Sequence, residues 1–545
     1  MTIKYTVARA ILEQLNHFEV EYIFGVTGDS IVGLLGELST QSQIKFILTR
    51  HESAAGFMAS TYAKLTGKLG VCVATSGPGM ANLLNGLGDA YADQVPVLAI
   101  TGQVPTTKIG TSSKQYIDQQ RLIEPLAAYS AQLSSPTALV PLLQRAVQTA
   151  IKQKAVAHLS VPKDLFLQPY SGELIPPNPY LYKQLPSDLG NVLVAAHFLS
   201  KCKKPIILAG HGALGCHDEI VSLAHKLDAG IILSLGAKGL IPENNEYMLG
   251  GIGEGGSQEA AEIMQECDGL LIIGAMWYPK TFLSPNIPFV QIERELDHLQ
   301  FDKNLHTALI GDAKKILGPL YERITATAKP EWKNRVHLVH NQWQHSVNEE
   351  ASILSEPIDP AFIMKILSEE IPSTAVITLD TGDHTVWFNR SFTTKGQKVL
   401  FSGTWRTLGY ALPAGICAGL IFPDKEIIVL AGDGGFTMNL GELSTLMMLH
   451  LPIKIVIFNN HCLAMEKNKM QYMGLKPYGV ELVNPNFASL AEAYGIRGIR
   501  IEHPQNLRDG IRNMLQTKGP VLLEIISSTQ ATSLSKVKAV SSFSK

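Results

Sequence analysis

Residues 431–460 read AGDGGFTMNLGELSTLMMLHLPIKIVIFNN, and they carry the strongest structural signal in this chain. An apolar run, IIVLA, leads into Gly432-Asp433-Gly434-Gly435, a helical pattern follows, and a second apolar run ends at Asn459-Asn460. This order is typical of two parallel strands joined by a crossover helix, so both polar loops lie at the carboxyl ends of strands. Open α/β sheets bind their ligands at that edge.

The residue types in these two loops predict a diphosphate and a metal ion. The glycines let backbone N–H groups approach phosphate oxygens closely, and the helix that follows adds the positive end of its dipole. Asp433 and Asn460 supply oxygen ligands at neighbouring strand ends, which suits Mg²⁺ bound together with a diphosphate. Each motif alone is also a common turn sequence. Together, at this spacing, they favour the binding site.

The same alternation of apolar strands and helical patterns runs through most of the 545 residues. It predicts parallel sheets that are covered by helices on both faces. Residues 168–190, rich in proline and polar turn formers, are typical of a linker. We therefore expect an α/β protein of three doubly wound parallel-sheet domains, at residues 1–170, 186–330 and 355–530.

Composition excludes several other classes of protein. Lys and Arg number 46 against 48 Asp and Glu, a net charge of -2 that offers no attraction to nucleic acid. The six cysteines form no CxxC pair and have no zinc-ligand spacing, so we expect reduced, buried thiols. The N-terminus lacks the uninterrupted apolar core of a signal peptide, and the longest apolar stretch, GYALPAGICAGLIF, is broken by Gly and Pro. These features predict a cytoplasmic protein without integral membrane contact.

GDGG followed by NN at this spacing resembles the signature of thiamine-diphosphate-dependent enzymes, within the group of pyruvate oxidases and acetolactate synthases. The resemblance extends over nearly the whole chain, and the pyruvate oxidases look closest. It implies that Asp433, Asn460 and the backbone carbonyl of Cys462 bind Mg²⁺, and that the loop Gly432-Asp433-Gly434-Gly435 binds the diphosphate of thiamine diphosphate. The three domains would be the pyrimidine-binding, central and diphosphate-binding domains of that family.

Two further segments of the third domain are similar to the family. Residues 380–387, DTGDHTVW, match a stretch that closes over the diphosphate, which assigns Asp383 and His384 to the cofactor. Residues 407–413, TLGYALP, match a segment whose apolar residue, here Leu408, lies between the two rings of the cofactor and keeps it bent.

The activating group is expected in the first domain. The cofactor reacts through a thiazolium C2–H, a very weak acid, and a carboxyl group hydrogen-bonded to its aminopyrimidine ring promotes loss of that proton. Glu52 alone would be an ordinary charge at a helix N-terminus. Its surroundings, RHESAAG and the later Ser76-Gly77-Pro78-Gly79, resemble the family's activating segment, which makes Glu52 catalytic. Gln115 matches a glutamine that faces the reacting carbon.

In this family the first and third domains meet across a subunit boundary. The resemblance therefore implies a homodimer or homotetramer with active sites between subunits, acting on a small 2-oxo acid, pyruvate. The paired histidines of simple pyruvate decarboxylases are absent near Gln115, which argues against a plain acetaldehyde-forming decarboxylase.

The central domain leaves FAD open as a third cofactor. Residues 210–215 fit GxGxxG after a strand, but the acidic residue that an NAD site needs after the next strand is missing. Residues 250–257 and 274–279 lie where related oxidases bind FAD, and Glu293 falls near the expected adenine-ribose contact. Glycine loops in a packed α/β domain also occur without any ligand.

The residues around the reacting carbon depart from the oxidase pattern, and they leave the second substrate undetermined. These residues are Lys114, Tyr116, Ala464, Met465 and Lys469. The first interpretation is a pyruvate oxidase-like enzyme, in which the enamine that remains after decarboxylation is oxidised. The alternative is a carboligase of the acetolactate synthase type. A third, a non-catalytic relative, is disfavoured because the main catalytic and metal-binding residues are all present.

Overall fold

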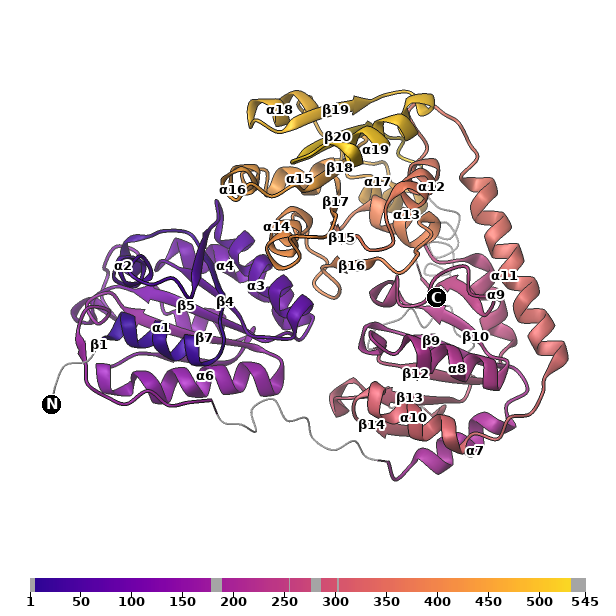
Figure 1. Cartoon of the computed structure of the whole chain (residues 1–545), viewed down its shortest axis with the longest axis horizontal. Helices are drawn as coiled ribbons and strands as arrows, with labels where there is room; N and C mark the ends of the chain where they lie inside the picture. Colours follow the sequence, from indigo (N-terminus) through magenta and orange to yellow (C-terminus); the bar gives the residue numbers. More distant parts are fainter. Residues whose placement is uncertain (1–4, 178–188, 254, 276–285, 301–302, 531–545) are drawn as a thin grey trace.

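Three α/β units make up the computed structural model, which describes the chain except residues 1–4, 178–188, 254, 276–285, 301–302 and 531–545. Each unit contains a six-stranded sheet whose strands all run parallel, with helices on both faces. Figure 1 shows the first unit in indigo and purple, the central unit in magenta, and the third unit, in orange and yellow, lying next to both. The predicted α/β class with three doubly wound sheets is confirmed.

The sheet of the first domain has the order β3-β2-β4-β5-β7-β6. Its strands are β2 (Tyr22–Gly25), β3 (Lys45–Leu48), β4 (Gly70–Ala74), β5 (Val97–Gln103), β6 (Ala127–Gln132) and β7 (Val156–Pro162). Its helices are α1 (Val7–His17), α2 (Val32–Leu38), α3 (Glu52–Thr66), α4 (Pro78–Ala92), α5 (Gln119–Ile123) and α6 (Leu139–Gln153). A short antiparallel pair, β1 (Tyr5–Thr6) with β8 (Pro169–Tyr170), brings the first described residues beside the start of the linker.

The central sheet has the order β11-β10-β9-β12-β13-β14, which is the order of dinucleotide-binding folds. Its strands are β9 (Pro205–Ala209), β10 (Gly230–Leu233), β11 (Met248–Gly251), β12 (Gly269–Ile273), β13 (Phe289–Glu293) and β14 (Leu305–Ile310). Its helices are α7 (Val192–Lys201), α8 (His217–Leu227), α9 (Gln258–Glu266) and α10 (Ala313–Arg323). The long helix α11 (Pro330–Glu350) then runs along the outside towards the third unit (Figure 1).

The third sheet, β16-β15-β17-β18-β20-β19, repeats the strand order of the first. Its strands are β15 (Val376–Leu379), β16 (Lys398–Phe401), β17 (Ile427–Gly432), β18 (Lys454–Asn459), β19 (Arg497–Ile501) and β20 (Val521–Ile526). Its helices are α12 (Pro360–Glu370), α13 (Asp383–Ser391), α14 (Ala411–Ile421), α15 (Asp433–Met438), α16 (Glu442–Met448), α17 (Ala464–Tyr472), α18 (Phe487–Ala493) and α19 (Leu507–Gln516). The strands β17 and β18 are hydrogen-bonded neighbours, as residues 431–460 predict.

The crossover between β17 and β18 differs from the sequence-based expectation in one respect. Two short helices, α15 and α16, replace the single helix, and α15 already begins at Asp433. Gly432 is extended, with φ -79° and ψ 157°, so helical geometry starts one residue later. Gly434 and Gly435 therefore lie in the first helical turn and not in a loop that precedes it.

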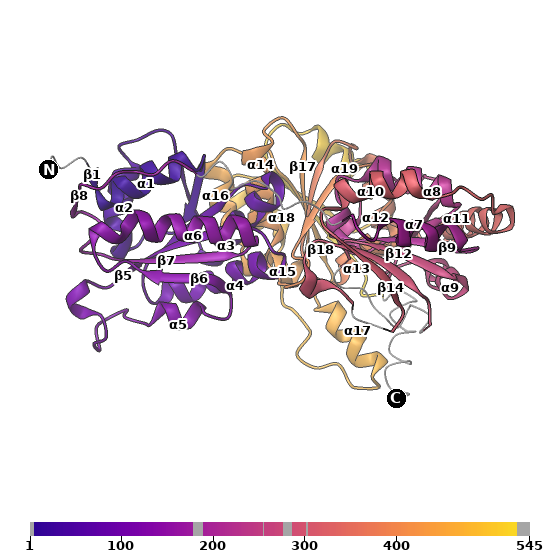
Figure 2. The same ribbon diagram turned by 90° about the horizontal axis from the view of Figure 1, so that it is seen from below.

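The first and third domains share one apolar core, to which α3, α4 and α14 contribute. Small residues allow these helices to approach closely: a Cβ on Gly86 would lie 2.5 Å from the Cα of Gly56. The helix α14 contains the apolar stretch GYALPAGICAGLIF and is buried between the two domains (Figure 2). Its apolar character therefore comes from burial in protein. None of the helices among the described residues has the length and hydropathy of a membrane span.

Candidate active site

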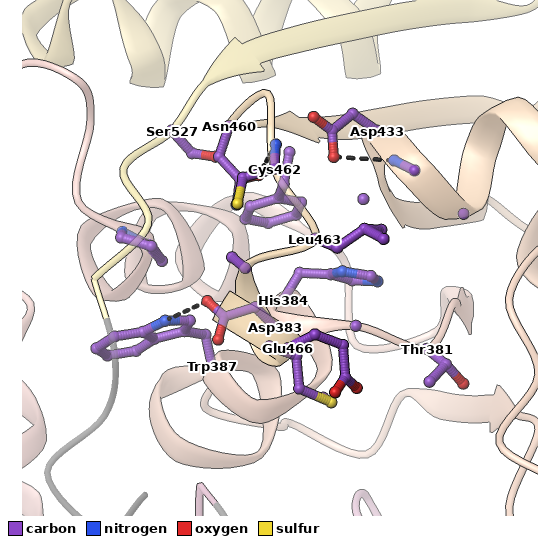
Figure 3. Close-up of a pocket in the computed structure, with 18 of the residues that line it drawn as sticks. Thr381, Asp383, His384, Trp387, Asp433, Asn460, Cys462, Leu463, Glu466 and Ser527 are labelled. Carbon is purple, nitrogen blue, oxygen red and sulfur yellow. Dashed lines mark hydrogen bonds between the residues drawn. The ribbon is translucent and has the colours of Figure 1, made fainter. Parts of the chain in front are cut away.

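A cavity of about 190 Å³ lies at the carboxyl ends of β15, β17 and β18 (Figure 3). That volume is below the roughly 300–1,000 Å³ of a complete small-molecule pocket. Its lining includes every third-domain residue that the sequence analysis selects: Asp383, His384, Leu408, Gly432, Asp433, Gly434, Gly435, Asn460 and Cys462. The topology thus brings residues from four separate segments to one place.

Asp433 is a buried acidic group of this cavity with a hydrogen bond to each carboxylate oxygen. Its side chain is only 3% exposed, and burial raises its pKa. One carboxylate oxygen accepts a hydrogen bond from the backbone N–H of Gly434 at 2.9 Å, and the other accepts one from Asn484 Nδ2 at 2.7 Å. Both contacts fix the orientation of the carboxylate, and a bound cation would stabilise its charged form.

Asn484 is a site residue that the sequence analysis misses. Its Nδ2 donates to Asp433 and also to Asn459 Oδ1, the latter at 2.9 Å. It lies in an irregular segment between α17 and α18, where no periodic pattern marks it. Only a contact between segments far apart in the chain reveals its position beside Asp433.

The two asparagines at the end of β18 have different surroundings. Asn459 is fully buried and donates to Glu524 Oε1 at 2.7 Å, whereas Asn460 lines the cavity. The Asn460 side-chain oxygen accepts from the backbone N–H of Cys462 at 3.1 Å. The structure therefore distinguishes Asn460, the predicted metal ligand, from its structural neighbour.

The backbone at Cys462 has the geometry that a carbonyl ligand needs. Cys462 pairs with Glu481 in an antiparallel bridge whose hydrogen bonds are made by the flanking residues, Leu463 N–H to Val480 O and Leu482 N–H to His461 O. In such a pair the carbonyl of Cys462 points away from the facing segment. Because Mg²⁺ prefers oxygen ligands, the carbonyl of Cys462 and not its thiol is the predicted ligand.

His384 has a buried ring nitrogen in the cavity without a hydrogen-bond partner among the described residues. Burial lowers the pKa of its imidazole to about 3, so the ring is neutral at neutral pH. Its Nε2 is buried and has no hydrogen-bond partner among the described residues, although the side chain lines the cavity. The ring stacks on Phe458 with centroids 5.8 Å apart, and a Cβ on Gly432 would lie 3.0 Å from Nδ1. In the tautomer that carries the ring proton on Nε2, this nitrogen could donate to a phosphate oxygen.

Two carboxyl groups precede His384: Asp380, which is buried, and Asp383, which is partly exposed. Burial raises the pKa of both Asp380 and Asp383 to about 7. Asp380 accepts hydrogen bonds from the N–H groups of Thr381 at 2.8 Å and Gly409 at 3.0 Å, and thereby ties the end of β15 to the segment that carries Leu408. Asp383 accepts from Trp387 Nε1 at 3.1 Å. A carboxyl group that holds a proton near neutral pH can lie beside a diphosphate without full charge repulsion.

The first-domain residues lie elsewhere. Glu52 is the first residue of α3, and its carboxylate accepts a hydrogen bond from Asn82 Nδ2 at 3.0 Å. Gln115 is exposed with φ 64°, and its backbone contacts the position where a Cβ of Gly77 would lie. A Cβ on Gly79 would lie 3.3 Å from the Glu52 carboxylate. Glu52 and Gln115 therefore both lie beside the N-terminus of α4.

The cavity contains no first-domain residue among those that the structure describes. One chain thus holds two separate groups of predicted site residues, one around Asp433 and one around Glu52. Of the residues that depart from the oxidase pattern, Ala464 and Met465 line the cavity. Lys469 is exposed, with its amino group 4.0 Å from Glu466.

The glycines of the central domain are used in packing. The 210–213 turn contacts the end of β12: Gly212 N–H donates to Gly274 O at 2.9 Å, and a Cβ on Gly274 would lie 2.4 Å from the Cα of Gly212. A Cβ on Gly255 would lie 2.2 Å from Val386 O in the third domain. These close contacts explain why glycine occurs at these positions, and the explanation needs no bound ligand. The 276–279 part of the expected FAD segment and residue 254 lie outside the described residues.

Among the described residues of the central domain, the surroundings of Glu293 are compatible with the FAD prediction. It ends β13, and one carboxylate oxygen accepts from Arg294 N–H at 2.8 Å. The other oxygen is buried and has no partner among the described residues. FAD therefore stays a prediction.

Family models match three separate parts of the chain. The model of the thiamine pyrophosphate enzyme N-terminal TPP binding domain matches residues 5–122, the central-domain model residues 192–320, and the C-terminal TPP binding domain model residues 380–525. The chain belongs to the thiamine pyrophosphate enzyme family. Both groups of predicted site residues lie within the two TPP binding domains of this family.

Named relatives cover nearly all of the chain. A Bacillus subtilis (strain 168) protein whose name describes it as thiamine pyrophosphate-containing, YdaP, is 34% identical over 526 residues, 96% of this chain and 91% of the relative. A Methanocaldococcus jannaschii protein named as an acetolactate synthase large subunit is 32% identical over 550 residues, 95% of this chain and 91% of the relative. The acetolactate synthase large subunit of Lactococcus lactis is 30% identical over 544 residues, which cover 96% of this chain and 92% of the relative. The expected closeness to pyruvate oxidases stays a prediction, and these names favour the carboligase alternative.

Proposed function

We propose that the protein binds thiamine diphosphate and Mg²⁺, decarboxylates a 2-oxo acid such as pyruvate, and joins the remaining two-carbon unit to a second 2-oxo acid. This is the reaction type of an acetolactate synthase, in which two pyruvate anions and one proton yield 2-acetolactate and CO₂. The observation that carries the proposal is the cavity at the strand ends. There, the Asp433 carboxylate, the Asn460 side chain and the unpaired Nε2 of His384 come together.

The residues present fit the cofactor. Asp433, Asn460 and the carbonyl of Cys462 would supply three oxygen ligands to Mg²⁺, which prefers hard oxygen ligands and keeps phosphate oxygens among them. The Gly432-Asp433-Gly434-Gly435 segment and His384 would bind the diphosphate. When bound, thiamine diphosphate supplies a carbon nucleophile that adds to the 2-oxo group and takes up the electron pair released with CO₂.

The chain's own residues would position the cofactor and control one proton. Asp383 and His384 lie where the diphosphate would bind. Burial raises the pKa of Asp383 to about 7 and lowers that of His384 to about 3, so Asp383 is partly protonated and His384 is neutral near pH 7. Leu408 lines the same cavity and offers an apolar surface to the cofactor rings. Glu52 would hold the proton that is exchanged with the aminopyrimidine ring.

The two groups of site residues support a homodimer or homotetramer. Glu52 and Gln115 do not line the cavity of their own chain, so a complete site requires Glu52 of the partner subunit. A pocket closed from two chains would also exclude water from the reacting carbon, which protects the intermediate from side reactions.

Carboligation is favoured over oxidation by two observations. Relatives that cover more than nine-tenths of this chain are named as acetolactate synthase large subunits. The central-domain glycines that suggest FAD are explained by contacts within the protein. Oxidation of the two-carbon unit would need an electron acceptor, and the proposed reaction needs none.

One experiment separates the two outcomes. Purified protein is incubated with thiamine diphosphate, Mg²⁺ and pyruvate without oxygen, while the visible spectrum is recorded and acetolactate and acetate are measured. Acetolactate formation without a change in the visible spectrum is expected. A flavin band that bleaches with pyruvate, together with acetate formation, would instead identify an oxidase.

A further inference from the structure

A buried glutamate of the third domain contacts the segment that precedes Glu52. Glu442, the first residue of α16, is fully buried. Its Oε1 accepts a hydrogen bond from the backbone N–H of Arg50 at 2.8 Å and from that of His51 at 3.1 Å. Two backbone N–H groups of the first domain therefore donate to one carboxylate oxygen of the third domain. Figure 1 shows α16 next to the first domain.

Thr445 extends this contact by one more residue. Its hydroxyl is 2.7 Å from Glu442 Oε2 and 3.3 Å from the carbonyl oxygen of Leu48. At Gly441, just before α16, a Cβ would lie 3.3 Å from the Cβ of Arg50, so the two backbones are close here. The third domain thus holds the backbone from Leu48 to His51 at three points.

The segment that is held determines where Glu52 lies. His51 is the N-cap of α3, and its Nδ1 accepts from the N–H of Ser53 at 3.1 Å. Glu52 follows immediately as the first helical residue. Fixing two successive N–H groups before Glu52 restrains the backbone at the start of α3, and with it the direction of the Glu52 Cα–Cβ bond; the carboxylate itself is held by Asn82.

We propose that Glu442 is a positioning residue for Glu52 of its own chain. This inference rests on the proposed function, in which Glu52 activates the cofactor. Glu442 belongs by sequence to the diphosphate-binding domain, only nine positions after Asp433. It nevertheless acts on the Glu52 group, which completes the site of the partner subunit. A substitution of Glu442 is therefore expected to impair the active site that contains the Asp433 of the partner chain, not the site that contains Asp433 of the same chain.

The first test measures proton loss directly. The exchange of the cofactor C2 proton with D₂O is followed by NMR in the protein loaded with thiamine diphosphate and Mg²⁺. Glu442→Ala removes the acceptor and leaves two N–H groups unpaired; we expect exchange roughly 10–100-fold slower, as for a misplaced catalytic group. Glu442→Gln keeps an acceptor oxygen and should stay within about threefold of wild type. Cofactor affinity is expected to stay within about threefold in both variants.

Controls separate this effect from loss of folding and from failure of the proposed function. Glu492→Gln removes one exposed carboxylate of the same domain and should leave exchange unchanged. Thr445→Val removes the hydroxyl that lies beside the Leu48 carbonyl and should slow exchange severalfold. It serves as the test variant if Glu442→Ala does not fold. Glu52→Gln must itself slow exchange. If it does not, the proposed function is wrong, and with it the role of Glu442.

The second test asks which active site Glu442 serves. Two variant chains carrying different affinity tags are co-expressed, and the mixed oligomers are purified. If Glu442 acts through Glu52, a Glu442→Ala chain paired with an Asp433→Asn chain should recover activity. One site of this pair combines the intact Asp433 of the first chain with the well-placed Glu52 of the second. Glu442→Ala paired with Glu52→Gln should not recover. Recovery in the second pair and not in the first would overturn the inference. So would a Glu442→Ala protein that exchanges the C2 proton at the normal rate, or one that loses cofactor affinity in proportion to its activity.

Discussion

At the scale of single residues, the geometry of the predicted metal site depends on Asn484, which donates hydrogen bonds to Asp433 and Asn459 at the same time. Residues that orient metal ligands contribute about 10–100-fold to metal affinity. For Asn484→Ala we expect Mg²⁺ affinity to fall by that factor and thiamine diphosphate affinity to fall with it, as measured by titration calorimetry. Asn513→Ala, at an exposed position of α19, is the matched control and should change neither affinity. Unchanged Mg²⁺ binding in Asn484→Ala would contradict this role.

Asp380 should make the stability of the cofactor-free protein depend on pH. Burial raises its pKa from 3.8 to about 7, so between these values the folded protein binds a proton that the unfolded chain releases. The free energy of unfolding therefore falls as pH rises from about 4 to about 7, with each unit of pKa difference contributing about 1.4 kcal/mol at most. In Asp380→Asn this contribution is absent.

We expect the denaturation midpoint of the wild type to fall more steeply than that of Asp380→Asn between pH 5 and pH 7.5. Because three domains need not unfold in one step, the comparison uses midpoints at each pH and not an extrapolated free energy. Parallel profiles for the two proteins would show that the Asp380 carboxyl group titrates in its ordinary range.

At the scale of elements, the position of Glu52 depends on how closely α3 and α4 pack. A Cβ on Gly86 would lie 2.5 Å from the Cα of Gly56 and 2.7 Å from the carbonyl oxygen of Ser53. Gly86→Ala must therefore push the two helices apart, and we expect a loss of about 1–3 kcal/mol in the free energy of unfolding.

The matched control for Gly86→Ala is Gly36→Ala. Gly36 also lies within a helix, but a Cβ there meets nothing within 4 Å. Alanine should leave stability unchanged or raise it by up to about 1 kcal/mol. Denaturant midpoints check both variants, and equal shifts would argue against close helix packing as the cause.

Apolar runs predict the central strands of each sheet better than the edge strands. The buried strands β4, β5, β15, β17, β18 and β20 all follow from such runs. Of the edge strands, β3 follows from the run IKFILTR, whereas β6, β16 and β19 are partly exposed and lack a continuous apolar pattern. The apolar pattern of this crossover also does not predict that the one expected helix is divided into α15 and α16.

At the scale of the whole molecule, the separation of Glu52 from the cavity predicts complementation between chains. Glu52→Gln and Asp433→Asn should each be inactive as pure proteins. In a mixed dimer, one site combines the intact Asp433 of one chain with the intact Glu52 of the other, while the second site has both defects. Purified mixed dimers should therefore recover about half of the wild-type activity per dimer. No recovery would mean that each chain completes its own site.

The third-domain site residues could be predicted from the sequence because their proximity follows from local order. Asp433 and Asn460 end two strands that are consecutive in one crossover unit, and Asp383 and His384 follow a third strand of the same sheet. Parallel strands place their carboxyl ends at one edge, so these positions converge whatever the rest of the molecule does. The cofactor roles of these residues stay predictions until the binding experiments are made.

The contacts of Asn484 and Glu442 could not be predicted in this way. Asn484 binds Asp433 across 51 positions, and Glu442 binds the Arg50 N–H across 392 positions and a domain boundary. The periodicity of apolar residues indicates which face of a helix or strand is buried, but it does not indicate which distant segment covers that face. Packing of α3, α4 and α14 into one core brings Glu442 to the backbone before Glu52, and the same packing leaves Glu52 outside the cavity of its own chain.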